Sequence, residues 1–141
     1  MIRYTESLTP SLPVHVALLI LLPMGFGMLA PINVVAGCVS AATFYLLALV
    51  AFVVMAPRIV VTDTELRAGR AVIQLELLGE AVIVERAHRA EALGDARTWK
   101  VLRGWIPRGL LIAVNDPADP TPNWYVSTRR PEKLQAILAE S

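Results

Sequence analysis

A long segment without charge limits what this chain can fold into. The 51 residues from Ser7 to Pro57 contain no Asp, Glu, Lys or Arg, and their one histidine is His15. A soluble domain rarely leaves so long a segment uncharged, whereas a helix needs only about 20 apolar residues to cross the hydrocarbon core of a bilayer. The segment is long enough for two such helices and a short turn.

We therefore predict that residues 1–57 form a transmembrane hairpin. Its two helices are expected at residues 12–29 and 34–56. Pro23 lies inside the first of them, and because proline lacks an N–H group and its ring clashes with the preceding turn, it predicts a kink there.

The basic residues around the hairpin predict its orientation. The turn between the helices carries no charge, whereas Arg3 precedes the first helix and Arg58 and Arg67 follow the second. Because basic residues accumulate on the cytoplasmic side of a membrane, we expect a multi-pass protein of the cell membrane with both termini in the cytoplasm. A secretory signal peptide, the rival interpretation, needs a basic start, and here Arg3 is balanced by Glu6.

Small residues in the second helix indicate a close helix contact. Ala36 and Ser40, and likewise Gly37 and Ala41, are four residues apart, a spacing that lets two helix backbones approach each other. The contact could be internal to the hairpin, or it could be made with another membrane protein or a second copy of the chain. Cys38 is the only cysteine and is expected to be buried as a small apolar residue.

The rest of the chain, residues 58–141, has the pattern of a small β-rich domain in the cytoplasm. Short alternating segments predict seven strands, and the apolar stripe of Leu134, Ile137 and Leu138 predicts a closing helix at residues 131–140. We expect an α+β membrane protein whose soluble part is an antiparallel β-barrel or sandwich. The predicted strands are 58–62, 65–68, 71–78, 80–85, 98–103, 108–114 and 123–128.

Three stretches carry a family resemblance. They are RIVVTDTELRAGRAVI after the hairpin, the block from Trp99 to Pro107, and DPADPTPNWYVSTRRPEKLQAIL near the end. With them the chain resembles an actinobacterial family of small two-span membrane proteins that is catalogued as a domain of unknown function. The order of elements is also similar to that of pleckstrin-homology-like domains. The resemblance implies an anchor and a small cytoplasmic domain, and no activity or site residues.

Motifs for catalysis or cofactor binding are missing from the sequence. It has no phosphate-binding glycine loop, HExxH, GxSxG or CxxC, so we expect neither an enzyme nor a bound cofactor or metal. His88 lies in a charged stretch and is expected to be solvated. Asp116 and Asp119 could hold a cation, but Asp-Pro pairs are also common turn formers.

The second half of the β-rich part is its basic half. From Arg97 to Lys133 the chain carries seven basic and three acidic residues, interleaved with aromatic ones. This pattern fits a solvated surface, contact with anionic lipid headgroups or an acidic protein partner. Nucleic acid is not expected, because the net charge of the chain is only +1. The candidate headgroup or partner-binding residues are Arg103, Arg108, Trp124, Arg129 and Arg130.

Arg129 and Arg130 pose a local problem. They precede a helix whose positive N-terminal end disfavours basic side chains, so a carboxylate should offset them. We expect Glu132, Asp116 or Asp119 to form a structural salt bridge there, and Ser127 or Thr128 to cap backbone groups at the corner.

The sequence as a whole favours a non-enzymatic adaptor or accessory subunit at the membrane. Its expected partners are membrane lipids and another membrane or cytoplasmic protein, and a homo-oligomer is possible. The alternative is a small transport or envelope-biosynthesis component that acts through its hairpin.

Overall fold

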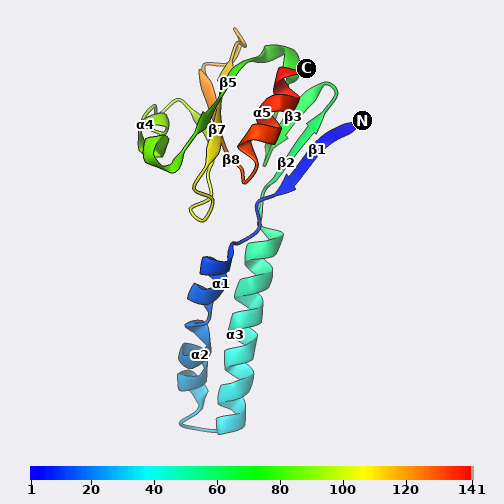
Figure 1. Ribbon diagram of the computed structural model, residues 1–141. Coiled ribbons are helices and arrows are strands. Elements are labelled where there is room, and N and C mark those ends of the chain that lie inside the picture. Colours follow the sequence, from blue (N-terminus) through cyan, green and yellow to red (C-terminus); the bar gives the residue numbers. More distant parts are fainter. Residues whose placement is uncertain (141) are drawn as a thin grey trace. The chain divides into compact units, whose positions relative to one another are not determined.

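The computed structural model describes residues 1–140 and divides into two compact units (Figure 1). Residues 9–56 form an apolar helical unit, and residues 1–8 together with the chain from Pro57 onward form the β unit. The N-terminal residues thus belong to the β unit and not, as we predicted, to the hairpin.

The apolar unit is a helical hairpin with an interrupted first arm. Helices α1 (Leu12–Leu18) and α2 (Leu21–Leu29) make up that arm, and α3 (Val34–Val54) is the second. The break at Leu19 lies four residues before Pro23, where the proline ring would meet a helical carbonyl group, which confirms the predicted kink. By length and composition, the segments Leu12–Leu29 and Val34–Val54 could each cross a membrane.

The turn of the hairpin is capped by Asn33. Its Oδ1 accepts hydrogen bonds from the N–H groups of Val35, at 2.8 Å, and Ala36, at 3.2 Å. These two donors have no partner inside the helix, so the cap supplies one.

The two arms pack through small residues. A Cβ added to Gly25 would lie 2.8 Å from the Ala41 Cα, and one added to Gly37 would lie 3.0 Å from Ala30. Ser40 donates its hydroxyl hydrogen to the Gly25 carbonyl group. The Gly37 and Ala41 pair therefore serves packing within the hairpin, the first of the two alternatives. Cys38 is exposed and not buried, because it lies outside this contact.

The β unit contains two four-stranded sheets. The first is antiparallel, in the order β1 (Ile2–Ser7), β2 (Arg58–Thr62), β3 (Glu65–Ala68), β4 (Ala71–Gln74). The second has the order β5 (Leu78–Val84), β7 (Gly109–Val114), β8 (Asn123–Ser127), β6 (Trp99–Val101), and only β6 pairs in parallel, with β8. Helix α5 (Pro131–Ala139) follows β8.

Of the two predicted arrangements, barrel or sandwich, the sheets do not form the closed barrel within the described chain, and β6 departs from the antiparallel pattern. Two further predictions for this unit were wrong in detail. Strand β1 was missed, because its charged residues Arg3 and Glu6 resemble a flank of the hairpin. The strand predicted at residues 71–78 stops at Gln74, where a 3-10 turn, η1 (Leu75–Leu77), carries the chain from the first sheet to the second.

One apolar core serves both sheets and the last helix. It includes Ile59 and Leu66 from the first sheet, Ile112 and Val126 from the second, and Leu134 from α5. Leu134 is fully buried, and the other members of the predicted α5 stripe pack against the same core. The stripe is therefore confirmed.

Gly109 is required by the close approach of an aromatic ring. A Cβ at this position would lie 2.5 Å from the ring of Tyr125, which is fully buried, and 2.9 Å from the Val126 carbonyl oxygen. Gly104, in the preceding loop, has nothing within 4 Å of its added Cβ.

We expect Gly109→Ala to destabilise the β unit by about 2 kcal/mol, since a methyl group forced into a packed site displaces side chains and backbone. The matched control Gly104→Ala should change stability by less than about 0.5 kcal/mol. Chemical unfolding of both variants in detergent, followed by tryptophan fluorescence, measures the difference. Equal stabilities of the two variants would contradict the close packing of Tyr125 on Gly109.

Candidate functional site

The corner between β8 and α5 is fixed by Thr128. This residue is fully buried, and its backbone N–H donates to the Arg108 carbonyl group at 3.2 Å. Its hydroxyl oxygen accepts the N–H of Arg130 at 3.1 Å, immediately before α5 begins. The expected capping role therefore falls to Thr128, while Ser127 accepts the N–H of Arg103 at 3.2 Å.

The carboxylate at this corner is Glu6. One of its oxygens accepts the backbone N–H of Arg129 at 2.9 Å, and the other accepts the Thr128 hydroxyl at 2.5 Å and the Tyr4 hydroxyl at 2.7 Å. Arg129 also donates a guanidinium hydrogen to the Ser7 carbonyl oxygen at 3.3 Å. We had predicted Glu132, Asp116 or Asp119 for this role, so the prediction was wrong in its choice of residue.

Glu6 explains how a helix can begin after two arginines. An anion near the first turn of a helix is stabilised by the helix dipole, and Glu6 brings one from a strand 122 residues earlier in the chain. No local sequence signal predicts this contact, because Glu6 and Thr128 lie on opposite sides of the apolar segment.

Tyr4 is the buried member of the cluster, with 4% of its surface exposed. Burial, followed by the hydrogen bond to Glu6, raises the pKa of Tyr4 to about 12. The phenol is therefore neutral throughout the physiological range and acts as a hydrogen-bond donor to Glu6.

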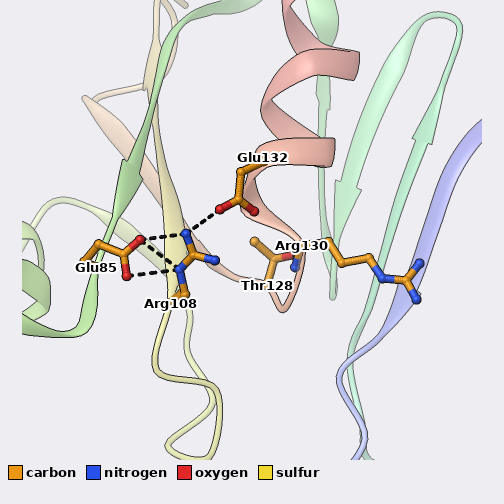
Figure 2. Close-up of polar contacts among 5 residues, drawn as sticks. All are labelled: Glu85, Arg108, Thr128, Arg130 and Glu132. Atoms are coloured by element: carbon orange, nitrogen blue, oxygen red, sulfur yellow. Dashed lines mark hydrogen bonds and ion pairs between the residues drawn. The ribbon is translucent and has the colours of Figure 1, made fainter.

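Arg108 is held in a separate ion-pair cluster (Figure 2). Its Nε lies 2.9 and 3.0 Å from the two oxygens of Glu85, and its Nη2 lies 2.6 Å from Glu85 and 2.5 Å from Glu132. The hydrogen bonds to Glu85 and Glu132 raise the pKa of Arg108, and Arg108 in turn lowers the pKa of Glu132. Its charge is matched inside the unit, so Arg108 is a weak candidate for binding a ligand.

Two aromatic residues of the basic half lie in different surroundings. Trp124 is 4% exposed and belongs to the core, so its ring is not presented to a ligand at the surface. Trp105 lies in the loop between β6 and β7, and the Arg103 guanidinium lies 5.8 Å from the centre of its ring, a cation–π distance. Arg103 also donates to the Leu102 carbonyl group at 2.9 Å.

Arg130 extends its side chain away from the Arg108 cluster (Figure 2). It is exposed, and no hydrogen bond or ion pair engages its guanidinium within residues 1–140. Arg58 and Arg70 lie close to each other at one end of the first sheet. Arg58 pairs with Ser7, and the Arg58 carbonyl group accepts the N–H of Gly69, the residue before Arg70. Gly69 turns the chain with a φ of 64°.

These basic residues gather at one end of the β unit. It is the end at which β1 leaves at Leu8 and β2 returns after Pro57, whose carbonyl group accepts the Leu8 N–H at 3.0 Å. We call it the arginine end, and define it by Arg58, Arg70, Arg103, Arg129 and Arg130.

Most carboxylates lie at the opposite end, beyond the other tips of the strands. Strand directions place the β2–β3 turn, η1, the β7–β8 loop and the end of α5 there (Figure 1). Three cations pair with carboxylates of this end: the terminal amine of Met1 bonds to Asp63, Arg3 lies 3.2 Å from Glu140, and Arg67 lies 3.4 Å from Glu65. We call this the acidic end, and it carries Asp63, Glu65, Glu76, Glu80, Asp116, Asp119 and Glu140.

The remaining polar candidates have ordinary surroundings. Asp116 and Asp119 accept backbone N–H groups of Ala118 and Thr121 at 2.8 and 2.9 Å, so both act as turn formers. His88 is exposed. Within residues 1–140 no group of three or more metal-ligating side chains comes together.

The family profile of DUF3093, described as a protein of unknown function, matches residues 3–138. No curated protein and no solved structure matches the chain. Because the profile covers nearly the whole chain, the protein belongs to the DUF3093 family.

The fold also predicts how the Tyr4 and Glu6 cluster responds to alkali. Since the pKa of Tyr4 is about 12 in the folded chain and 10.0 in its ordinary state, only the unfolded chain releases this proton between those pH values. The contribution of Tyr4 to stability is therefore complete below about pH 10 and is lost as the pH rises to about 12, by roughly 2 kcal/mol.

We expect a tyrosinate absorbance transition near pH 12 in the wild type whose amplitude falls in Tyr4→Phe. Burial also raises the pKa of Tyr125, so part of the absorbance change at high pH remains in this variant. Spectrophotometric titration at alkaline pH measures the loss of amplitude. A Tyr4 transition at the pKa of free tyrosine would contradict the buried cluster.

Proposed function

We propose that this member of the DUF3093 family is an integral membrane protein of the cell membrane with a two-span anchor and both termini in the cytoplasm. Its β unit is a non-enzymatic binding module of pleckstrin-homology-like character, in which a C-terminal helix packs against two sheets. The arginine end of this module binds the anionic headgroups of the membrane that holds the anchor.

The observation that carries the proposal is where the arginines lie. They surround the two points, Leu8 and Pro57, at which the chain leaves the β unit for the apolar helices. Only residues 9–11 connect Leu8 to α1, and a chain spans at most about 3.5 Å per residue. If the helices cross a bilayer, the arginine end stays close to its headgroups, where each basic residue contributes about 1 kcal/mol.

The hairpin fits an anchor better than a transport path. Ser40 donates to the Gly25 carbonyl group, Thr43 donates to Val39 at 2.8 Å, and His15 contacts the Ser11 carbonyl group at 3.1 Å. These polar side chains are thus engaged by the backbone of their own unit. No observation on the described helices favours the alternative, a transport or envelope-biosynthesis role.

We expect that reversing the corner charges removes bound anionic lipid. The Arg129→Glu, Arg130→Glu double variant and the wild type would be extracted as full chains in native nanodiscs, and their lipids quantified by mass spectrometry. Anionic lipid enrichment should fall by about threefold or more in the variant, since two favourable contacts of about 1 kcal/mol each become unfavourable.

Two further variants make this test specific. Arg129→Gln with Arg130→Gln removes the charges without placing new carboxylates beside Glu6, and should show a smaller loss. Arg67→Glu with Arg97→Glu makes the same change in net charge outside the arginine end and should keep the enrichment. Chemical unfolding followed by tryptophan fluorescence reports that each variant is folded.

Unchanged lipid enrichment in a folded corner variant would overturn the headgroup proposal. A stoichiometric protein that is lost from that variant, with its lipids unchanged, would replace it with an acidic protein partner.

A further inference from the structure

A groove runs between the outer strand of the second sheet and the last helix. Strand β5 forms one wall and α5 the other, and the space between them is about 400 Å³. The groove lies wholly within the β unit; it begins at Glu132, in the first turn of α5, and extends toward Glu80 and Ala139 at the acidic end. Its lining includes Glu80, Ala81, Glu132, Gln135, Ala136 and Leu138.

The strand wall of the groove is a sheet edge. β5 is the outermost strand of its sheet, so alternate backbone groups face away from β7. The Ala81 carbonyl group is one of these, because it accepts a hydrogen bond of 2.7 Å from the Gln135 side chain. The N–H of an antiparallel strand residue points to the same side as its carbonyl group, so the Ala81 N–H also faces the groove.

The Gln135 side chain therefore occupies the position in which a further strand would pair with β5. Its amide N–H donates to the Ala81 carbonyl group as the backbone N–H of a paired strand would. Because it is a side chain, it can rotate away and free this carbonyl group. The neighbouring side chains of α5 are small, because Ala136 and Ala139 contribute only methyl groups to the groove. An extended chain with alternating small apolar side chains fits between these walls.

The acidic side chains around the groove indicate that the bound segment is basic. Glu80 is exposed at one side, and no ion pair within residues 1–140 engages it. Glu132 lines the other end, and the remaining carboxylates of the acidic end, including Glu76 and Glu140, lie beyond β5 and α5. Among residues 1–140, the one cation that pairs with a lining residue is Arg108, which is shared between Glu132 and Glu85.

We propose that the groove binds an extended, basic segment of a protein partner, which adds a strand to the free edge of β5. The segment replaces the Gln135 side chain on the Ala81 carbonyl group, places apolar side chains against Ala136 and Leu138, and directs basic side chains toward Glu80. Main-chain pairing supplies affinity in this mode of recognition, and the flanking side chains supply specificity. This inference stands independently of the headgroup proposal.

The test uses the full chain in nanodiscs of zwitterionic lipid, so that a basic probe is not captured by the membrane. The probe is a fluorescein-labelled peptide of alternating lysine and valine, and binding is followed by fluorescence anisotropy. Two comparison peptides are used, one with glutamate in place of lysine and one with N-methylated valines, which cannot donate backbone hydrogen bonds. The basic peptide should bind saturably and about tenfold or more tightly than either comparison peptide.

Variants locate the binding in the groove. Ala136→Trp fills it and should weaken binding by about tenfold, whereas Lys133→Trp, on an exposed position of the same helix outside the groove, should not. Glu80→Lys should weaken binding by about threefold, whereas Glu76→Lys, the same charge change outside the lining, should have less effect. Gln135→Ala removes the internal competitor and should tighten binding.

Three results would overturn the proposal: no saturable binding of the basic peptide, equal binding of the N-methylated peptide, or equal effects of Glu80→Lys and Glu76→Lys. The last of these would mean that the peptide responds only to the general acidity of this end.

Discussion

The structure depends on a constraint of connectivity: the apolar hairpin is inserted between two strands that are hydrogen-bonded to each other. Ser7 pairs with Arg58, and the pairing continues through the bond from the Leu8 N–H to the Pro57 carbonyl group. The inserted unit must therefore start and end at neighbouring points. Two antiparallel helical arms satisfy this requirement, whereas a single membrane-crossing helix would separate β1 from its sheet by the thickness of a bilayer.

The same constraint shapes the electrostatics of the β unit. Because β1 returns to its sheet, it brings Glu6 to the corner before α5, where the carboxylate offsets the helix dipole and the backbone of Arg129. The guanidinium of Arg108 is neutralised by Glu85 and Glu132 in the next cluster. Arg130 extends an exposed side chain away from that cluster (Figure 2), while most acidic side chains lie toward the opposite end of the strands. Positive and negative charges are therefore separated along the strand direction of the β unit, although the net charge of the whole chain is only +1.

The parts of the fold that were predictable from sequence are those with a local periodic signal. The uncharged segment predicted both helical arms, Pro23 predicted the interruption, and the stripe around Leu134 predicted the last helix. What could not be predicted depends on contacts between distant segments. Strand β1 carries few apolar residues, and only its partner β2 makes it a strand. The selection of Glu6 rather than Glu132 or an aspartate follows from the return of β1 to its sheet, and the burial of Trp124 follows from the place of β8 between β7 and β6. The sequence has no short-range signal for either arrangement.

The position of Glu6 near the N-terminus also determines when its hydrogen bonds can form during synthesis. Tyr4 and Glu6 leave the ribosome before the apolar segment, but Thr128 and Arg129, which complete their hydrogen bonds, are added more than 120 residues later. At about 5–20 residues per second, this strand waits roughly 6–25 s for its last partners. Its sheet partner β2 follows directly after the apolar segment, so β1 has no strand to pair with until the apolar arms have been made, and its bonds to Thr128 and Arg129 form last.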